Sequence, residues 1–173
     1  MASILKVNEI QHTGGTSAMT VAADGKVTLP QPVTFKVPMF HATRSSSTGN
    51  LSSGYSALYD TVVFDTDSWY DTSTGRYTPQ RAGYYNFMGQ WSLTTTSSTI
   101  YLSVSLRFNG TLKFNRVQYG GSSTYPRPQV SGVFYMNGST DYVDVYITFA
   151  GSANNIWTDV QANNFTGHYI GSA

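Results

Sequence analysis

Apolar and polar residues alternate with a period of two through most of the chain, which is the spacing of a β-strand that buries one face. In the segment 100–107, Ile100, Leu102 and Val104 share one face, and the residues between them are mostly polar. The segment 141–149 follows the same rule, and helical periodicity is absent. Such strands are expected to have one face in water. Segments of this kind are expected as strands at 33–42, 57–64, 76–79, 83–93, 100–108, 112–119, 129–136, 141–150 and 165–170.

The segments between these strands are rich in Gly, Ser and Asn, and two of them are Asn-Gly dipeptides, at Asn109 and Asn137. An Asn-Gly dipeptide between two alternating runs is typical of a tight β-hairpin. Roughly ten strands joined by such turns predict an all-β fold, a ten-stranded antiparallel jelly-roll sandwich. We expect this knob domain to span residues 34–173.

The strand expected at 83–93 departs from simple alternation. Tyr85 and Phe87 lie on one face, but Tyr84 and Met88 give the other face apolar side chains as well. The last strand likewise sets Phe165 and Tyr169 on one face against Ile170 on the other. Because the outer face of a two-layer sandwich is normally wet, these residues predict cover by another subunit. The alternative is that they are scattered surface aromatics.

Residues 1–33 form a different kind of segment, with short apolar-alternating pieces separated by Gly-rich turns. Such pieces cannot close a core by themselves. Two alternatives remain open at this point: an extended arm that becomes ordered on a partner chain, or a disordered leader. We favour the arm and expect its apolar residues to anchor it, namely Ile4, Val7, Ile10, Val27 and Leu29.

The composition excludes several classes of function. Charged residues make up 11% of the chain, the net charge is +1, and the Lys and Arg residues are scattered singly, so nucleic acid is not an expected partner. The chain has no Cys, which excludes disulfides and thiolate metal sites. It shows neither a secretory signal nor a run of about 20 apolar residues, so we expect neither classical export nor membrane insertion.

No catalytic motif is present. His12, His41 and His168 stand on three separate segments, and no nucleophile elbow, zinc-binding His pair or phosphate-binding Gly loop occurs. We therefore predict a protein that is not an enzyme and that has no catalytic residues and no cofactor.

An acidic segment offers one candidate metal site. Asp65, Asp67 and Asp71 could gather around a calcium ion, since hard cations prefer carboxylate oxygens. The pattern is not that of an EF-hand loop, because Arg76 occupies the position of the closing Glu. A solvated acidic loop is the favoured interpretation, and no metal ligands are assigned.

Three Asn-x-Ser/Thr triplets begin at Asn109, Asn137 and Asn164. In a secreted protein they would indicate glycosylation. Here turn chemistry explains them better, since two of them are the Asn-Gly turns themselves.

The long loops are predicted to lie together. If the chain reverses direction at every strand, both tight Asn-Gly turns share one end with the termini, and the long loops share the opposite end. Loops on a rigid scaffold often carry binding residues, and Tyr, Trp and Arg are common anchors. The alternative is that these loops are solvated and that Trp157 folds back into the sandwich. The residues expected to contact an outside ligand are Tyr125, Arg127, Asn154, Asn155 and Trp157.

One stretch of the knob carries a resemblance to a known family. It consists of Tyr59, Asp65, Tyr70, Thr74-Gly75, Tyr77, Pro79, Gly83, Tyr85 and Phe87, flanked by "KVPMFHA", "DYVDVYI" and "NFTGHYI". Together these segments resemble the globular head of complement component one-q and the tumour-necrosis-factor-like jelly rolls. Gly89 departs from the pattern, because the family usually closes this motif with an aromatic residue.

The resemblance implies a homotrimer whose subunits pack around an axis through the inner sheet. It also implies that Phe87 and Phe165 fill the core and that Gly83 occupies a site that no side chain could occupy. The residues assigned to the trimer interface are Tyr84, Met88, Tyr169 and Ile170.

The segment "ILKVNEIQHTGGTSAMTVAADGKVTLP" resembles the opening of structural proteins of tailed bacteriophages. This resemblance implies a virion protein that binds other virion proteins through its N-terminal arm. The favoured role is a capsid decoration or cement protein. The alternatives are a tail-fibre or receptor-binding tip that binds a host-surface glycan or protein, and a free sugar- or protein-binding module of the same fold.

Overall fold

A computed structural model of the chain describes residues 8–11, 13–15, 17–29, 36–46, 52–95, 99–121, 125–150, 153–156 and 160–172. The chain divides into two compact units, residues 1–36 and 37–173. The sequence placed this division after residue 33. None of the described residues is helical, and accordingly no helix among them could cross a membrane.

The first unit contains a small antiparallel sheet, which we call the arm sheet. Its strands are β1 (Glu9–Gln11), β2 (Ser17–Val21) and β3 (Val27–Thr28), in the order β1-β2-β3. Gly15 and Gly25, which lie between successive strands, have φ values of 82° and 84°, a region that favours glycine. The short apolar-alternating pieces of the N-terminal segment therefore form strands that pair with one another.

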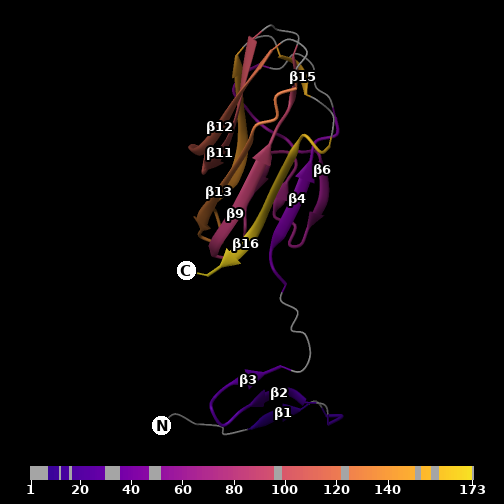
Figure 1. Cartoon of the computed structure of the whole chain (residues 1–173), viewed down its shortest axis with the longest axis vertical. Helices are drawn as coiled ribbons and strands as arrows, with labels where there is room; N and C mark the ends of the chain where they lie inside the picture. The colour runs from indigo at the N-terminus through magenta and orange to yellow at the C-terminus, as the bar shows by residue number, and fades with distance from the viewer. Residues whose placement is uncertain are drawn as a thin grey trace. The chain divides into compact units, whose positions relative to one another are not determined.

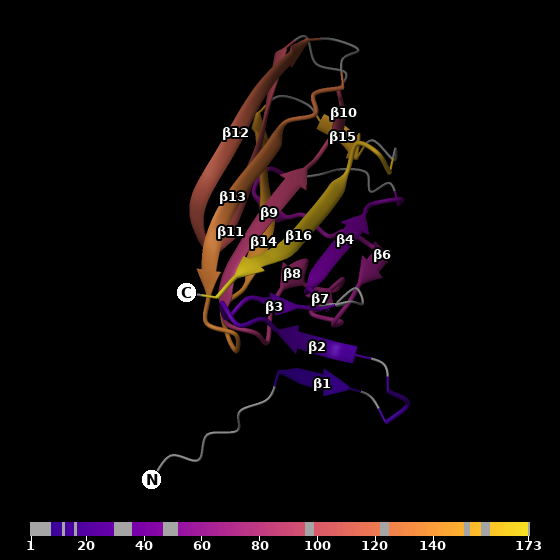
Figure 2. The same ribbon diagram turned by 60° about the horizontal axis from the view of Figure 1, so that its bottom comes forward.

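The second unit is the knob, an antiparallel sandwich of two sheets (Figures 1 and 2). The five-stranded sheet has the order β13 (Gln129–Met136), β9 (Gly83–Gln90), β16 (Asn164–Gly171), β4 (Met39–Thr43) and β6 (Thr61–Asp65). The six-stranded sheet has the order β12 (Thr111–Gly121), β11 (Thr99–Phe108), β14 (Val143–Ala150), β8 (Arg76–Tyr77) and β7 (Tyr70–Asp71), with β5 (Tyr55–Ser56) also on β14. The all-β jelly roll expected from the sequence is confirmed.

Several short segments differ from the expected strands. Residues 57–60 are not a strand, because the chain there crosses from β5 in one sheet to β6 in the other, burying Ala57 and Tyr59 on the way. Segments that were expected to be loops form the short strands β5, β7 and β15 (Ala153–Ile156), and β15 pairs with β10 (Leu93–Thr95). This pair lies at the end of the knob opposite the C-terminus (Figure 2).

Aromatic rings fill the space between the sheets. Phe40 stacks on Tyr77, with ring centroids 4.1 Å apart, and meets Phe165 edge-on at 4.8 Å. Tyr85 and Phe87 alternate with exposed or half-buried residues along β9 and are fully buried. The sequence-based assignment of Phe87 and Phe165 to the core is thus confirmed. The largest fully buried side chains are Trp91, Tyr59, Tyr77, Tyr85, Phe40, Phe87, Phe165, Leu93, Leu102, Leu106 and Met136.

Gly83, at the start of β9, has a φ of 144°, which L side chains rarely adopt. A Cβ atom there would lie 2.5 Å from the carbonyl oxygen of Gly171 and 2.5 Å from Cε2 of Tyr169. Both the backbone conformation and the space therefore require glycine, as the sequence predicted.

Gly167 on β16 permits close packing of two core rings. A Cβ atom there would lie 2.6 Å from Cδ1 of Phe87 and 2.7 Å from Cε1 of Phe40. Both rings are buried and cannot move aside. We expect Gly167→Ala to lower the free energy of unfolding by about 1–3 kcal/mol through overpacking. Denaturant unfolding measures this, with Gly171→Ala as the control, because a Cβ atom at Gly171 meets nothing within 4 Å.

The outward face of the six-stranded sheet is less exposed to solvent than alternation predicts. Asp144 on β14 is fully buried, although it points away from the core. Arg107 on β11 donates from Nε to its Oδ1 at 3.0 Å and also contacts its Oδ2 through Nη2. The same Nη2 donates to the Ser56 hydroxyl at 2.7 Å, and the guanidinium lies 4.1 Å above the ring of Tyr146. A paired charge with several hydrogen bonds thus replaces the expected solvent.

Candidate functional site

The five-stranded sheet turns one face toward the core and the other away from it. Cross-strand pairing arranges the outward residues in rows, and we call them together the open sheet face. The rows are Tyr135 and Tyr84; Val133, Asn86, His168 and Met39; Ser131, Met88, Thr166, His41 and Phe64; and Gln129, Gln90, Asn164, Thr43 and Thr61. These rows contain no Lys, Arg, Asp or Glu.

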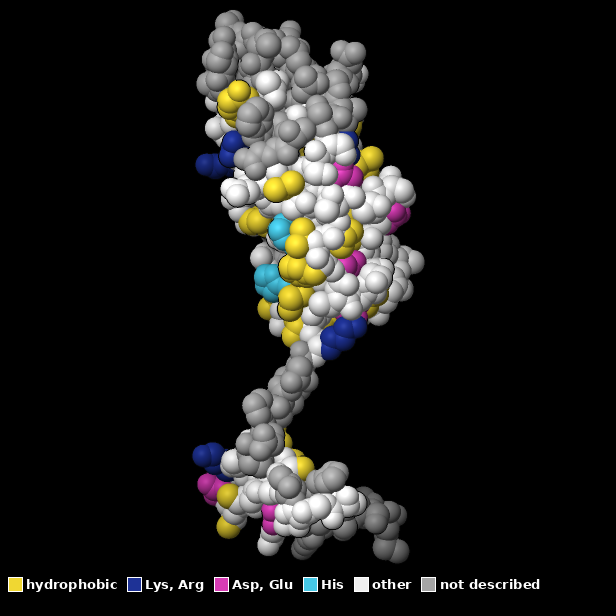
Figure 3. Space-filling view, turned by 90° about the vertical axis from the view of Figure 1, so that its right-hand side faces the viewer, with side chains coloured by type: hydrophobic (Ala, Val, Ile, Leu, Met, Phe, Trp, Pro, Cys, Tyr) yellow, Lys and Arg dark blue, Asp and Glu magenta, His cyan; other side chains and the backbone are white. Residues whose placement is uncertain are grey.

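The open sheet face is apolar toward one end and carries amides and hydroxyls toward the other. Hydrophobic side chains gather around histidines on this side of the knob (Figure 3). Tyr84 and Tyr135 meet edge-on with ring centroids 5.5 Å apart. The exposed fractions are 43% for Tyr84, 46% for Tyr135, 51% for Val133, 45% for Phe64 and 37% for Met39. Large apolar side chains half open to solvent over neighbouring strands are typical of an interaction surface.

Three of the four residues that the sequence assigned to a subunit interface lie on or beside this face. Tyr84 and Met88 belong to the open sheet face, and Ile170 is 54% exposed at the end of β16. Tyr169 lies differently: its ring packs edge-on against Tyr85 at 5.2 Å, on the core side. Tyr169 thus lies at the margin of the core and not on the open sheet face. Its side chain points to the opposite side of β16 from that of Ile170.

Two of the three histidines lie on the open sheet face. His41 and His168 lie on neighbouring strands, and the His41 ring is 5.9 Å from that of Phe64. Burial lowers the pKa of His41 and so favours its neutral form. His12 lies outside the described residues.

A groove adjoins the open sheet face where β13 approaches the β11–β12 hairpin. Its volume is about 390 Å³, and its walls are mainly aromatic. Val133 and Tyr135 belong both to the groove and to the open sheet face, so the two apolar surfaces are continuous. The remaining lining residues are Phe108, Lys113, Phe114 and Phe134.

The sequence did not assign Val133, Tyr135, Met39 or Phe64 to the interface. A signal was present in "VFYM" at the end of β13, where apolar residues occupy both faces as they do in β9. Such a run indicates a strand that is covered on both sides.

The residues expected at the outer end are only partly described. Tyr125 is 43% exposed, and the backbone amide of Arg127, itself an exposed residue, donates to Oε1 of Gln118 at 2.9 Å. Asn154 and Asn155 lie on β15, but their side chains are outside the description, as is the whole of Trp157. Their assignment to ligand contact stays a prediction.

The arm residues expected to anchor the chain are exposed where the structure describes them. Ile10, Val27 and Leu29 are about half exposed, at 47%, 52% and 47%. Ile4 and Val7 lie outside the described residues.

The acidic segment does not bring its carboxylates together. Asp65 accepts from the amides of Ser68 and Tyr70 at 3.0 and 2.8 Å, whereas Asp71 accepts from Ser73 and Thr74 in a separate turn. Within the described parts of the chain, no three His, Asp or Glu side chains cluster closely enough to hold a metal ion. These carboxylates order turns.

The Asn-Gly turns show the chemistry expected of them. Asn109 has a φ of 49°, and its side chain donates to Asp141 at 2.8 Å and accepts from the amide of Tyr142 at 2.9 Å. The side-chain oxygen of Asn137 accepts from three successive backbone amides, those of Ser139, Thr140 and Asp141. Both side chains therefore stabilise the turns, which explains two of the three triplets.

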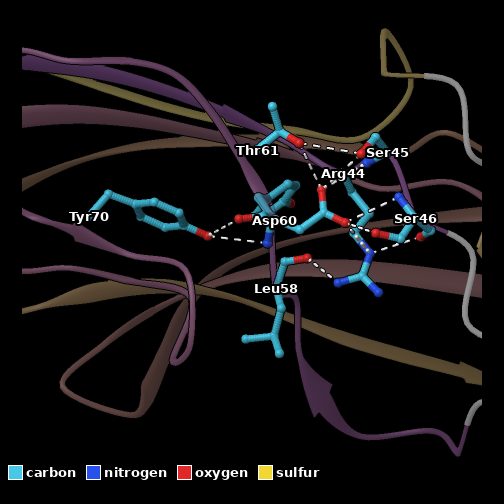
Figure 4. Close-up of polar contacts among 8 residues, drawn as sticks. Arg44, Ser45, Ser46, Leu58, Asp60, Thr61 and Tyr70 are labelled. Carbon is cyan, nitrogen blue, oxygen red and sulfur yellow. Dashed lines mark hydrogen bonds and ion pairs between the residues drawn. The ribbon is translucent and has the colours of Figure 1, made fainter.

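Figure 4 shows a polar cluster around Asp60, between β4 and β6. Its carboxylate accepts from the backbone amides of Ser45 and Ser46 at 3.0 and 3.1 Å and from both of their hydroxyls. Thr61 donates to it at 3.1 Å, and Nε of Arg44 lies 3.5 Å away. This cluster holds the end of the β4 segment against residues 58–61, and every interaction in it serves the fold.

The Asp60 cluster makes stability depend on pH. Burial alone would raise the pKa of Asp60, but the hydrogen bonds from Ser46, Ser45 and Thr61 outweigh it and lower the pKa to about 2. A carboxyl whose folded-state pKa is lowered stabilises the fold above its unfolded pKa, and that contribution disappears as the pH falls through the folded value. We expect a loss of about 1 kcal/mol between pH 4.5 and pH 2, after allowing for solvent screening.

Chemical denaturation across this pH range measures the effect of the Asp60 cluster. Asp60→Asn should be less stable than the parent at pH 6, and its stability should fall less between pH 4.5 and pH 2. Parallel curves for the two proteins would show that Asp60 does not cause the dependence.

No family model and no curated protein matches the sequence. Solved structures do match the fold. The globular domain of zebrafish complement 1qA has a TM-score of 0.61 and 14% identity, and the match covers 80% of this chain and 100% of that one. Murine APRIL has a TM-score of 0.59 and 15% identity, with 78% of this chain and 100% of that one covered. At such identities the likeness shows the fold alone, which is the fold that the sequence resemblance implied.

Proposed function

We propose that the protein is a homotrimer whose knobs associate through the open sheet face. The observation that carries the proposal is an apolar face, without formal charges, on a sheet whose other face already covers the core. Burying these side chains between copies would remove apolar surface from water with no charge to desolvate. The sequence resemblance favours three copies, because it implies packing around an axis at the sheet that contains β9 and β16.

The trimer is proposed to be a structural protein of a bacteriophage virion, without enzymatic activity. The arm resembles the opening of tailed-phage structural proteins, and it is a unit separate from the knob. The described polar clusters order turns and strands. The proposed partners are therefore two further copies of the chain and other virion proteins, bound through the arm.

The favoured role is a capsid decoration or cement protein, because the chain has no long shaft between arm and knob. The alternative, a tail-fibre or receptor-binding tip, draws support from the exposed Tyr125 and Arg127 near the end of the knob that contains β10 and β15. Antibody labelling of virions distinguishes the two roles by the position of the label, on the head or on the tail. Binding of the protein to host-surface glycans would favour the tip.

Deletion of residues 1–33 is expected to abolish attachment to the virion completely, because the knob would lose its arm while keeping its core and open sheet face. Co-sedimentation of the truncated protein with particles that lack the native copy measures attachment. Sedimentation velocity of the same sample is the control and should show a folded trimer. A truncated protein that still joined particles would overturn the anchoring role.

A further inference from the structure

The arm sheet is apolar on one side and polar on the other. Ile10 pairs with Met19 across β1 and β2, and Val21 pairs with Val27 across β2 and β3. Because directly paired residues point to the same side of a sheet, and residues 19 and 21 share a side along β2, these four side chains form one apolar face. The intervening Thr20, which pairs with Glu9 and with Thr28, lies on the polar face.

Nothing in the described part of the arm unit covers its apolar face. Ile10 and Val27 are about half exposed, at 47% and 52%, and so is Leu29, which follows β3, at 47%. Met19 and Val21 are only partly buried, and no residue described in this unit is fully buried. A sheet with one hydrophobic face is stable when that face is buried against another element. The arm sheet is therefore a single layer, and no covering layer is found among the described residues of its own unit.

We propose that the apolar faces of three arm sheets pack together and form one shared core in the trimer. This inference rests on the proposed homotrimer and deepens it, because it assigns the occupant of the arm face: the same face of two other copies. Ile10, Val27 and Leu29 then contact sister chains.

The connection between the units favours sister copies over any other partner. Residues 30–36 span at most about 25 Å even when fully extended. The chain joins the knob beside the proposed contact surface, since the carbonyl of Pro38 accepts from the amide of Tyr169 at 2.9 Å and β4 follows at once. Three arms tethered this closely have an effective concentration in the millimolar range.

The size of the face also fits a tethered partner. Three side chains that are about half exposed and two that are partly buried offer roughly 1,000 Å² over three copies, at the lower limit of specific interfaces. Such an area is too small to hold isolated arms together but sufficient once the knobs supply proximity. Charge agrees with this arrangement, because three identical apolar faces without ionic groups do not repel one another.

Cross-linking of the full-length chain tests this inference. The chain contains no Cys, so one introduced thiol reacts selectively. Met19→Cys places a thiol in the centre of the apolar face, and its neighbour Thr20→Cys places one on the polar face as the matched control. With a short bismaleimide at low micromolar protein, we expect Met19→Cys to give covalently linked copies at least five-fold more efficiently than Thr20→Cys. Val27→Cys should behave like Met19→Cys, and this second position guards against a local defect at residue 19.

Sedimentation of the same samples separates the two proposals. Trimers in which Met19→Cys and Val27→Cys link no better than Thr20→Cys would overturn the shared core and leave the trimer standing. Linkage of Met19→Cys to a different virion protein in purified particles, in place of linkage between copies, would also overturn it. Monomers would overturn both proposals.

Discussion

Tyr84→Asp is expected to convert the trimer into monomers at micromolar concentration. Tyr84 lies on the open sheet face, 43% exposed in the single chain and edge-on to Tyr135. In the trimer each copy would bury a carboxylate on a face whose rows contain no Lys or Arg, and the cost of desolvating that charge exceeds what one side-chain contact contributes. The substitution removes an apolar contact and adds a charge in all three copies, so the loss of association free energy occurs at each of the three contacts. Sedimentation velocity measures the change.

Tyr84→Phe is the matched control, because it keeps the ring and removes only the hydroxyl; this variant should remain a trimer. Val133→Asp, on the neighbouring strand β13, should act like Tyr84→Asp. Circular dichroism and thermal unfolding of each variant establish whether the knob is still folded. A folded Tyr84→Asp protein that sediments with the parent would show that the open sheet face is not the contact.

Arg107→Ala is expected to lower the free energy of unfolding by about 3–5 kcal/mol, because it leaves a buried carboxylate without its partner. Asp144 is fully buried, and the guanidinium of Arg107 contacts both of its oxygens. Hydrogen bonding to Asp144 raises the pKa of Arg107, although burial alone would lower it, so the arginine is charged at every accessible pH. The Ser56 hydroxyl also donates to this carboxylate, at 3.3 Å, but it is neutral and cannot balance the charge.

Arg76→Ala is the control for this prediction. Arg76 lies on β8, opposite Asp144 in register, but its guanidinium lies over the exposed side of the sheet, 4.1 Å from the ring of Tyr142. Removing such a contact costs about 0.5–1 kcal/mol. Denaturant unfolding at a fixed protein concentration compares the two variants. Equal losses would mean that the pair of Arg107 and Asp144 does not stabilise the knob.

Much of the fold could be predicted because one physical rule, the alternation of apolar and polar residues, applies to each long strand separately. The turns obeyed local chemistry as well, as Asn109 and Asn137 show. Local rules failed where the outcome depended on distant segments. Ala57 and Tyr59 read as a strand, but they cross between the sheets. Alternation predicted that Asp144 would be exposed to solvent. Its pairing with Arg107 and the approach of β5 bury it instead.

The open sheet face was foreseen in part. Tyr84 and Met88 could be recognised because the opposite side of the same strand holds Tyr85 and Phe87, which a core requires. Met39 and Phe64 could not, since Met39 becomes part of the surface only through pairing with β16, and Phe64 only through pairing with β4. A patch assembled from several strands depends on the order of the strands in the sheet. The sequence of one strand does not show that order.

Sedimentation equilibrium of the unmodified full-length chain tests the central proposal most directly. The homotrimer predicts a single species with three times the mass of one chain, unchanged from about 1 to 50 μM and at 0.5 M salt, because the open sheet face carries no formal charges for salt to screen. A mass equal to that of one chain over the same range would contradict it.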